Sequence, residues 1–219
     1  MGNRNFSRRD FLRTSFVGAA GLALAARMAG IEVTLVEVDA ELAALAAENA
    51  QLNGLAARVH AVALDVAAPA RAFAAAGLGP ESVERVLMNP PFNDPLRQRA
   101  SPDRQRRVAH AGPRGTLAVW TKTAARCLRP RGTLSLIWRA EGLAEVLNAL
   151  EPAFGAVTVL PVHGKAGEPA IRVLVRTAKA SRAPLTLLPG LVLADGSGRP
   201  TPEAEAVLRG GAALALAEC

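Results

Sequence analysis

Cysteine and histidine are scarce in this chain of 219 residues, which has two of the first and three of the second. Cys127 and Cys219 have the spacing of neither a disulfide framework nor a metal site, which favours a reducing compartment. His60, His110 and His163 are scattered along the chain and form no ligand cluster. We therefore expect no resident metal ion.

Long apolar runs are also missing, although 50% of the residues are hydrophobic. No stretch has the roughly 20 apolar residues of a membrane-spanning helix, so we expect no stable membrane association. The composition, rich in alanine and leucine, is that of a globular protein rather than a disordered one. The length allows one domain with a proper core, or one domain with an appendage.

Positive charge exceeds negative charge in this chain. Lys and Arg number 26 against 19 Asp and Glu, which gives a formal net charge of +7, and most of the basic residues are arginines. Arginine favours phosphate contacts, so this balance fits a polyanionic partner. A genome of high GC content also enriches arginine and alanine, so the charge alone does not decide the partner.

Residues 1–30 support two competing interpretations. Ser7–Arg13 resembles a twin-arginine export signal, and the apolar stretch Thr14–Ala26 ends in small residues that suit signal cleavage, which favours export to the periplasm. Alternatively, Val17–Arg27 is a glycine-started helix that leads to the strand Ile31–Glu37, which ends in an acid. That order is typical of the second half of a nucleotide-binding βαβ unit.

From residue 39 onward the pattern alternates regularly between helix and strand. This alternation predicts right-handed crossovers and a mostly parallel sheet, whereas the last two long strands fit an antiparallel pair. The expected fold class is therefore α/β, with a doubly wound Rossmann-like sheet. We expect helices at 40–52, 69–76, 116–128 and 141–150, strands at 58–64, 83–88, 133–138, 155–162 and 170–177, short apolar pieces at 185–188 and 191–194, and a small helix capped by Thr201.

Three successive predicted strands end in polar residues: Glu37, Asp65 and Asn89. Because parallel strands end at the same edge of a sheet, these side chains are expected to share one edge, where ligands of open α/β sheets bind. A carboxylate at a single strand end is usually a helix cap or a solvated charge. Three polar ends in register favour a binding cleft.

The motif Asn89-Pro90-Pro91-Phe92 follows a buried strand. Neither proline donates a backbone hydrogen bond, so the strand has to stop there, and Asn89 is held extended at its carboxyl end. An amide, free carbonyls and an aromatic face suit the binding of a flat group that carries an exocyclic NH2. The alternative is a strand that ends in a Pro-Pro turn beside a core phenylalanine.

Such a site can activate an aromatic amine, whose nitrogen is a poor nucleophile because its lone pair is delocalised into the ring. The Asn89 side-chain oxygen and the Pro90 carbonyl can accept both amine hydrogens, which frees the lone pair to attack an electrophilic methyl group. Phe92 would stack on the base once it is flipped out of a duplex or stack. No general base is needed if the proton leaves after methyl transfer.

The segment that follows the motif, from residue 93 to residue 115, is rich in arginine and proline and is expected to be a loop. A solvated charge run and a loop that grips RNA phosphates are both open interpretations. The arginines of the second interpretation are Arg97, Arg99, Arg104, Arg106 and Arg107.

The acidic strand end, Asp65, the motif at 89–92 and the late antiparallel strands together resemble the class I S-adenosylmethionine-dependent amino-methyltransferases. Within the small-methyltransferase superfamily, the chain is most similar to the bacterial tRNA(Val) N6-adenosine methyltransferase group, roughly from Val17 to the C-terminus. The resemblance implies S-adenosyl-L-methionine as cofactor and RNA, in particular tRNA, as substrate. The turn at 89–92 is shared with guanine N2 and protein-glutamine N5 methyltransferases, so it specifies a planar NH2 group better than the substrate.

The resemblance also implies roles for single residues. Gly18 belongs to the loop around the methionine part of the cofactor, Glu37 to the ribose hydroxyls, and Asp65 to the cofactor adenine. Asn89, with Pro90, Pro91 and Phe92, belongs to the catalytic corner that binds the target amine beside the cofactor.

Family members begin with a strand that carries Asp-x-Gly-x-Gly, but Arg13-Thr14-Ser15-Phe16 stands in its place here. We expect the first strand of the sheet to be missing or substituted. Residues 1–16 are then a signal-like segment joined to a truncated methyltransferase domain at 17–219, or the start codon is misassigned. Since half of the glycine loop is lost, we expect weak or no binding of S-adenosylmethionine.

Three classes of function remain open from the sequence. The first is a cytoplasmic N6-adenine methyltransferase of RNA, or a related enzyme acting on rRNA guanine N2 or protein glutamine N5. The second is an exported twin-arginine substrate of unknown activity. The third is a catalytically silent RNA-binding protein, which the arginine run and the lost loop favour.

Overall fold

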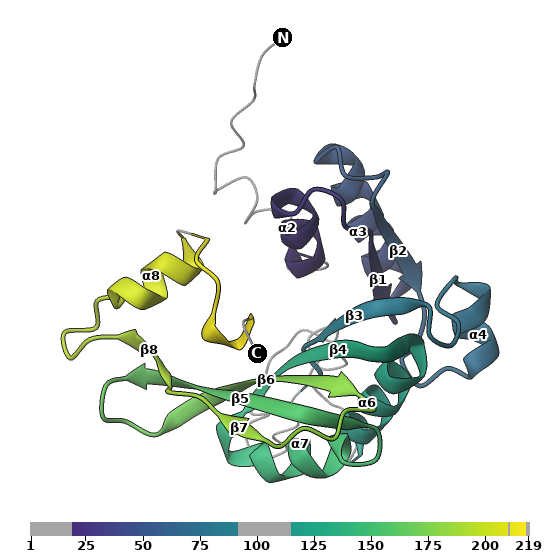
Figure 1. The fold of residues 1–219 in the computed structure, drawn as a ribbon. Coiled ribbons are helices and arrows are strands. Elements are labelled where there is room, and N and C mark those ends of the chain that lie inside the picture. The colour runs from purple at the N-terminus through teal and green to yellow at the C-terminus, as the bar shows by residue number, and fades with distance from the viewer. Residues whose placement is uncertain (1–18, 92–114, 210, 218–219) are drawn as a thin grey trace, which may run out of the picture. The chain divides into compact units, whose positions relative to one another are not determined.

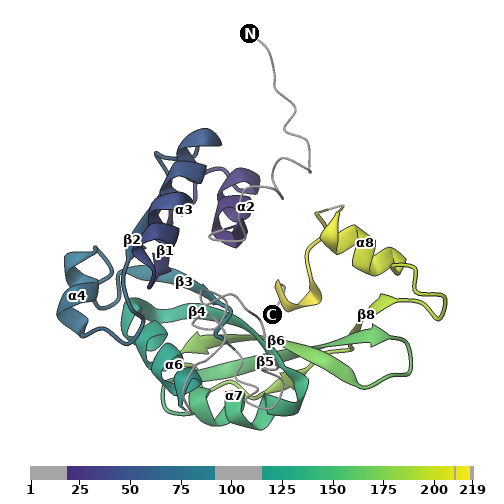
Figure 2. The same cartoon turned by 180° about the vertical axis from the view of Figure 1, so that it is seen from behind.

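The computed structural model describes residues 19–91, 115–209 and 211–217 of the chain. This part forms two compact units that divide between Ala76 and Gly77, and each unit is described by itself. Figures 1 and 2 show the two units from opposite sides.

The first unit is a parallel pair of strands with its helices. Asp39 caps α3, because its side-chain Oδ1 accepts hydrogen bonds from the backbone N–H groups of Glu41 and Leu42 at 2.9 and 3.2 Å. The elements of this unit are α2 (Ala19–Arg27), β1 (Val33–Glu37), α3 (Ala40–Leu52), β2 (Val59–Ala63) and α4 (Ala70–Ala75). Its buried core consists of Leu22, Ala25, Ala50, Leu55 and Val59, against which Val33 and Leu35 pack.

The second unit contains the larger sheet. Its elements are β3 (Val83–Met88), α6 (Thr116–Cys127), β4 (Leu128–Arg139), η1 (Ala140–Gly142), α7 (Leu143–Leu150), β5 (Phe154–Lys165), β6 (Ala170–Lys179), β7 (Thr186–Leu187), β8 (Leu191–Ala194), α8 (Pro202–Leu208) and η2 (Ala215–Ala217). The strands follow the order β3-β4-β6-β5-β7, and β8 also pairs with β5. β6 runs antiparallel to β4 and β5, and the other pairs are parallel.

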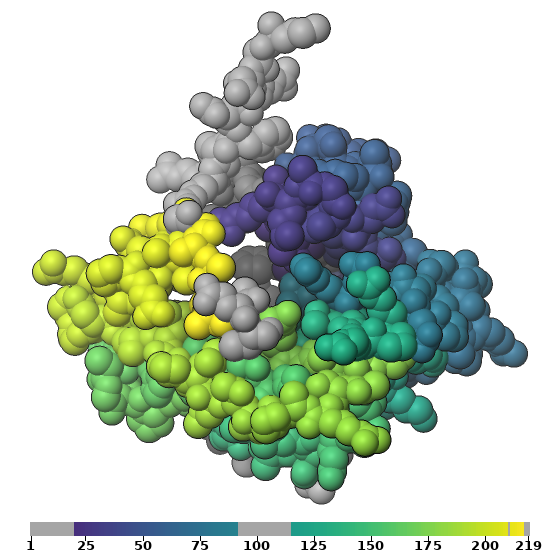
Figure 3. Space-filling view, viewed as in Figure 1, coloured from purple at the N-terminus to yellow at the C-terminus, as the bar shows by residue number. Residues whose placement is uncertain are grey.

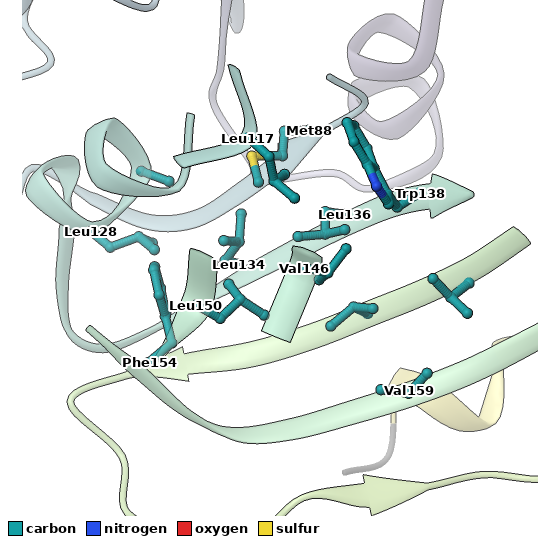
Figure 4. Packing of buried hydrophobic residues seen from close by; sticks show 13 residues of the cluster. Met88, Leu117, Leu128, Leu134, Leu136, Trp138, Val146, Leu150, Phe154 and Val159 are labelled. Atoms are coloured by element: carbon teal, nitrogen blue, oxygen red, sulfur yellow. The ribbon is translucent and has the colours of Figure 1, made fainter. Parts of the chain in front are cut away.

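The core of the second unit lies between this sheet and the helices α6 and α7, which cover one of its faces (Figures 1 and 2). Figure 4 shows the side chains of Leu134, Leu136 and Trp138 of β4 pointing toward this layer, together with Val146 and Leu150 of α7. Alternation along β4 leaves the residues between them on the opposite face of the sheet.

The outer edge of β5 is covered by the last strands of the chain. β7 pairs with Thr158 and Val159, and β8 pairs farther along with Val162, His163 and Lys165. In Figure 3 the residues after β6, in yellow-green, form part of the surface of this unit. Two short strands thus divide one long edge between them.

Most of the predicted elements are confirmed. The helix at 40–52 and the strands at 83–88 and 191–194 have the predicted bounds, and the long antiparallel pair is present as β5 and β6. Several boundaries were wrong. β5 and β6 end at Lys165 and Lys179 rather than at residues 162 and 177. β4 begins at Leu128 rather than residue 133, because Leu128 already pairs with Val83 across a register shift. The helix predicted at 141–150 opens with the 3-10 turn η1, and α7 begins at Leu143.

The strands of the two units form separate sheets within the described residues. Among the described residues, β1 pairs only with β2, and β3 pairs only with β4. In the doubly wound order 3-2-1-4-5-6, the first strand lies between the second and the fourth. The residues that stand in place of that first strand, Arg13–Phe16, lie outside the described residues, so its absence stays a prediction.

Candidate active site

Glu37 and Asp65 lie at the same edge of the first unit. β1 and β2 are parallel, with Glu37 opposite Ala63, and Asp65 follows two residues beyond that partner. The structure therefore brings the two predicted cofactor acids together at the carboxyl edge of this strand pair, where nucleotides bind in folds of this kind.

The backbone around Glu37 holds its carboxylate in place. Glu37 is half-buried, and its Oε1 accepts a hydrogen bond from the Asp39 N–H at 3.1 Å. Its carbonyl accepts another from the Leu64 N–H at 2.8 Å. The first bond ties the carboxylate to the start of α3 and leaves its second oxygen available for a hydroxyl group.

Asp65 is more exposed than Glu37. Its Oδ1 accepts a hydrogen bond from the Ala67 N–H at 2.8 Å, and its carbonyl accepts one from Ala68 at 2.9 Å. This local turn is a common use of aspartate after a strand and accounts for one carboxylate oxygen. The other oxygen can still accept from an amine.

Gly21 is a site-supporting residue that sequence reasoning gave no role. A Cβ added to it would lie 2.3 Å from Cδ2 of Leu35 and 3.1 Å from Cγ1 of Val33. Helix α2 thus packs on β1 through the bare backbone of Gly21. In nucleotide-binding βαβ units, a glycine with this function brings the helix close to the strand, so that the start of the helix is near the ligand.

The second unit contains the described part of the predicted catalytic corner. β3 ends at Met88, whose side chain is buried in the core, and Pro90 is fully buried. Asn89 between them is exposed, and Pro91 is half-buried. No hydrogen bond joins the Asn89 side chain to another residue within the described ranges. The buried neighbours hold the backbone on both sides of an amide that faces outward.

The position of Asn89 on the sheet follows from the pairing of β3 with β4. Met88 is opposite Leu136 of the parallel strand β4, so Asn89 comes level with Ile137, near the carboxyl end of that strand. A polar group at this edge of a parallel pair is placed to contact a ligand. Since Asn89 belongs to the second unit, its convergence with Glu37 and Asp65 stays a prediction.

Other predicted site residues lie outside the described residues. They are Gly18, Phe92 and the arginines Arg97, Arg99, Arg104, Arg106 and Arg107. The proposed export signal and the predicted domain boundary at residue 17 lie outside them as well. The roles assigned to these residues stay predictions.

The described residues contain no group of three or more His, Cys, Asp or Glu that could hold a metal ion, and none of their helices is long and apolar enough to cross a bilayer. Cys127 is buried, and its Sγ donates to the Leu78 carbonyl at 3.4 Å. Burial raises the pKa of this thiol, an effect that the neighbouring Arg126 and Lys179 reduce. A buried cysteine that is mostly protonated is a structural residue rather than a nucleophile.

The residues described here fit the adenosine half of S-adenosylmethionine. Glu37 offers a fixed carboxylate of the kind that binds ribose hydroxyls, and Asp65 offers an exposed acceptor for the adenine amine. Gly21 provides the close helix–strand packing that such a site needs.

Comparisons with known proteins point to one family. The family model of the methyltransferase small domain matches residues 15–165. The crystal structure of a predicted O-methyltransferase from Agrobacterium tumefaciens is 33% identical, and the match covers 91% of this chain and 88% of that one with a TM-score of 0.75.

Two further matches are more distant. The release factor glutamine methyltransferase of Chlorobaculum tepidum is 31% identical over 157 residues, which are 68% of this chain and 51% of that protein. The chain thus spans about half the length of this curated relative. The structure of TrmN from Thermus thermophilus is 21% identical, covers 75% of this chain and 42% of that one, and has a TM-score of 0.50, which shows a shared fold alone.

Proposed function

Because this chain belongs to the methyltransferase small domain family, we propose that it methylates the N6 amine of an adenine in RNA, with tRNA as the substrate class. The family and the fold confirm the predicted enzyme class, the S-adenosylmethionine-dependent methyltransferases. The choice of adenine and of tRNA rests on the motif at 89–92 and on the resemblance described above.

One observation carries the proposal: Asn89 is exposed at the carboxyl end of β3 while Pro90 beside it is fully buried. The buried proline fixes the backbone, so the Asn89 amide is presented without loss of much conformational entropy on binding. Its side-chain oxygen accepts one hydrogen of the target amine, and the Pro90 carbonyl accepts the other.

The chemical step then needs little further from the protein. S-adenosylmethionine, when bound, supplies an electrophilic methyl group on a sulfonium. With the cofactor bound, Asn89 and Pro90 would hold the amine with its lone pair directed at the methyl carbon, so that the methyl group could pass from sulfur to nitrogen. The amine proton leaves to solvent after the transfer.

Methylation of a protein glutamine is the second candidate function. The Chlorobaculum tepidum relative is by name a release factor glutamine methyltransferase. A glutamine amide is also a planar NH2 group, so the same corner can bind it. Substrate comparison therefore has to include both polymers.

The test is methylation of unmodified tRNA transcripts and of a purified bacterial release factor, with labelled S-adenosylmethionine in excess. Digestion to nucleosides and mass spectrometry identify N6-methyladenosine. We expect label in the RNA. Asn89→Ala should lower the methylation rate at least about a hundredfold, because it removes the side-chain oxygen that accepts a hydrogen bond from the target amine. Asn148→Ala is the matched control, since Asn148 lies exposed on α7.

Two results would contradict the proposal. Label in the release factor alone would favour the glutamine activity. Absence of label from both polymers, with RNA still bound, would favour a catalytically silent RNA-binding protein.

A further inference from the structure

Two arginines lie directly opposite each other on the face of the large sheet that α6 and α7 leave uncovered. Arg139 ends β4, and its partner on the antiparallel strand β6 is Arg172. The preceding pair, Trp138 and Val173, is buried in the core, so alternation places the arginines on the other face. Like charges at such a position are unfavourable unless an anion lies between them.

The contacts of Arg139 leave part of its guanidinium available. Its Nη1 forms an ion pair with Glu141 at 3.0 Å, but the Glu141 side chain is 76% exposed. Its Nε is buried and has no hydrogen-bond partner within the described part of the chain. An ion pair to an exposed carboxylate is weak, and a phosphate offers a guanidinium two parallel hydrogen bonds.

Arg172 adds a second guanidinium at the same place. Its Nη1 donates to the Ile171 carbonyl at 2.8 Å, which ties the group to the backbone of β6. η1, which follows Arg139 in the chain, packs beside β6. Both arginines are therefore positioned by regular structure rather than by a loop.

This arginine pair is close to the proposed catalytic corner. Asn89 comes level with Ile137 on the neighbouring strand, two residues before Arg139. Two residues along a strand and one strand across amount to roughly 8 Å between backbones. Ile137 and its partner Leu174, both half-buried, lie on the same face beside the arginines. Along this edge, the Asn89 amide is therefore followed by the apolar pair and then by the two guanidinium groups.

We propose that Arg139 and Arg172 bind a phosphodiester group that flanks the target adenine. The inference rests on the proposed RNA substrate, because the base and the phosphate are at opposite ends of a nucleotide. With the amine at Asn89 and the sugar over Ile137 and Leu174, the phosphate reaches the guanidinium pair. The arginines thus fix the register of the strand.

The test is a binding cycle with the full chain and a fluorescent single-stranded RNA of 12 nucleotides that carries one adenine. Single phosphates of this RNA are replaced by neutral methylphosphonates, and affinity is measured by fluorescence anisotropy at several salt concentrations. We expect Arg139→Gln to weaken binding about tenfold at low salt and to reduce the slope of log K against log salt by about 0.7, the value for one phosphate contact on a single strand.

The cycle assigns the contact to one phosphate. A methylphosphonate beside the adenine should weaken RNA binding by the parent protein. It should leave the RNA affinity of Arg139→Gln and Arg172→Gln nearly unchanged, because these variants have already lost the phosphate contact. Arg129→Gln is the matched control. Arg129 forms an ion pair with Glu84 at 2.7 Å at the other end of the same strand, and its removal should leave the phosphate effect intact.

Several outcomes would overturn the inference. One is equal sensitivity of parent and variants to every methylphosphonate, and another is loss of release-factor methylation in Arg139→Gln with RNA affinity unchanged. Arg139→Lys checks for loss of fold. It keeps the positive charge but cannot form the paired hydrogen bonds of a guanidinium, so it should recover only part of the RNA affinity that Arg139→Gln loses. If the affinities follow the expected pattern but no N6-methyladenosine is formed, the proposed function is contradicted, whereas the phosphate site is still supported.

Discussion

Glu37 and Gly21 illustrate how single residues shape the edge of the first unit where we expect the nucleotide to bind. One carboxylate oxygen of Glu37 accepts a hydrogen bond from the Asp39 N–H, and this bond fixes the side chain in the absence of a ligand. Gly21 contributes by the absence of a side chain, since α2 lies against Leu35 at its position. The first role is visible in sequence because an acid ends a strand. The role of Gly21 is not visible in this way, because it depends on Leu35, which lies on another element.

At the residue scale, we predict that Gly21→Val destabilises the first unit by about 1–3 kcal/mol. The Cβ alone would meet Leu35 at 2.3 Å, so the larger side chain forces α2 away from β1. Ala26→Val is the control, because Ala26 is exposed on the same helix and the change costs only helix propensity.

Urea unfolding, monitored by circular dichroism, gives the difference between the unfolding midpoints of these two variants. Equal midpoints would show that α2 does not pack on β1 through Gly21. Binding of S-adenosylmethionine, measured by calorimetry, should weaken in Gly21→Val and not in Ala26→Val.

The helix α8 and the strand β8 form an element-scale arrangement that depends on one hydroxyl. Thr201 Oγ1 accepts a hydrogen bond from the Ala204 N–H at 3.1 Å and donates one to the Val192 carbonyl at 2.6 Å. Its backbone N–H donates to Leu193 at 3.0 Å. The cap of α8 is therefore also its attachment to β8.

We predict that Thr201→Ala lowers the local stability of α8 by about 1 kcal/mol or somewhat more. Both hydroxyl bonds are lost, whereas Thr201→Ser keeps them. Hydrogen exchange of residues 202–208 should be faster in the alanine variant and close to the parent in the serine variant. Faster exchange in both variants would assign the effect to the lost methyl group instead.

Elements were predictable from sequence where the cause is local. α3 begins at its aspartate cap, and β3 stops where Pro90 and Pro91 prevent further pairing. The early start of β4 was missed, because Arg131 has a positive φ of 63° and Leu128 pairs with a strand far away in sequence. The proximity of Arg139 to Arg172 was missed for the same reason, since it depends on the register of β6.

At the scale of the whole molecule, each unit has its own buried core. Leu22 belongs to the first core at 4% exposure, and Leu134 belongs to the second at 0%. The two clusters share no residue among those described. We expect the stability of the units to respond separately to changes in each core.

We predict that Leu134→Ala destabilises the second unit by about 2–5 kcal/mol, and Leu22→Ala the first unit by a similar amount. Hydrogen exchange read by mass spectrometry should show the larger loss of protection in β4 and β6 for the first variant and in β1 and β2 for the second. Uniform loss across the chain in both variants would mean that the units unfold as one.

The division of the β5 edge between β7 and β8 has a consequence for solubility. An uncovered edge of twelve residues with valine at several positions would invite pairing with another chain. The residues from 186 to 194 occupy that edge, with Pro189 and Gly190 between the two short strands. We therefore expect the tail to protect the protein from self-association, and a version shortened before β7 to aggregate even with every catalytic group retained.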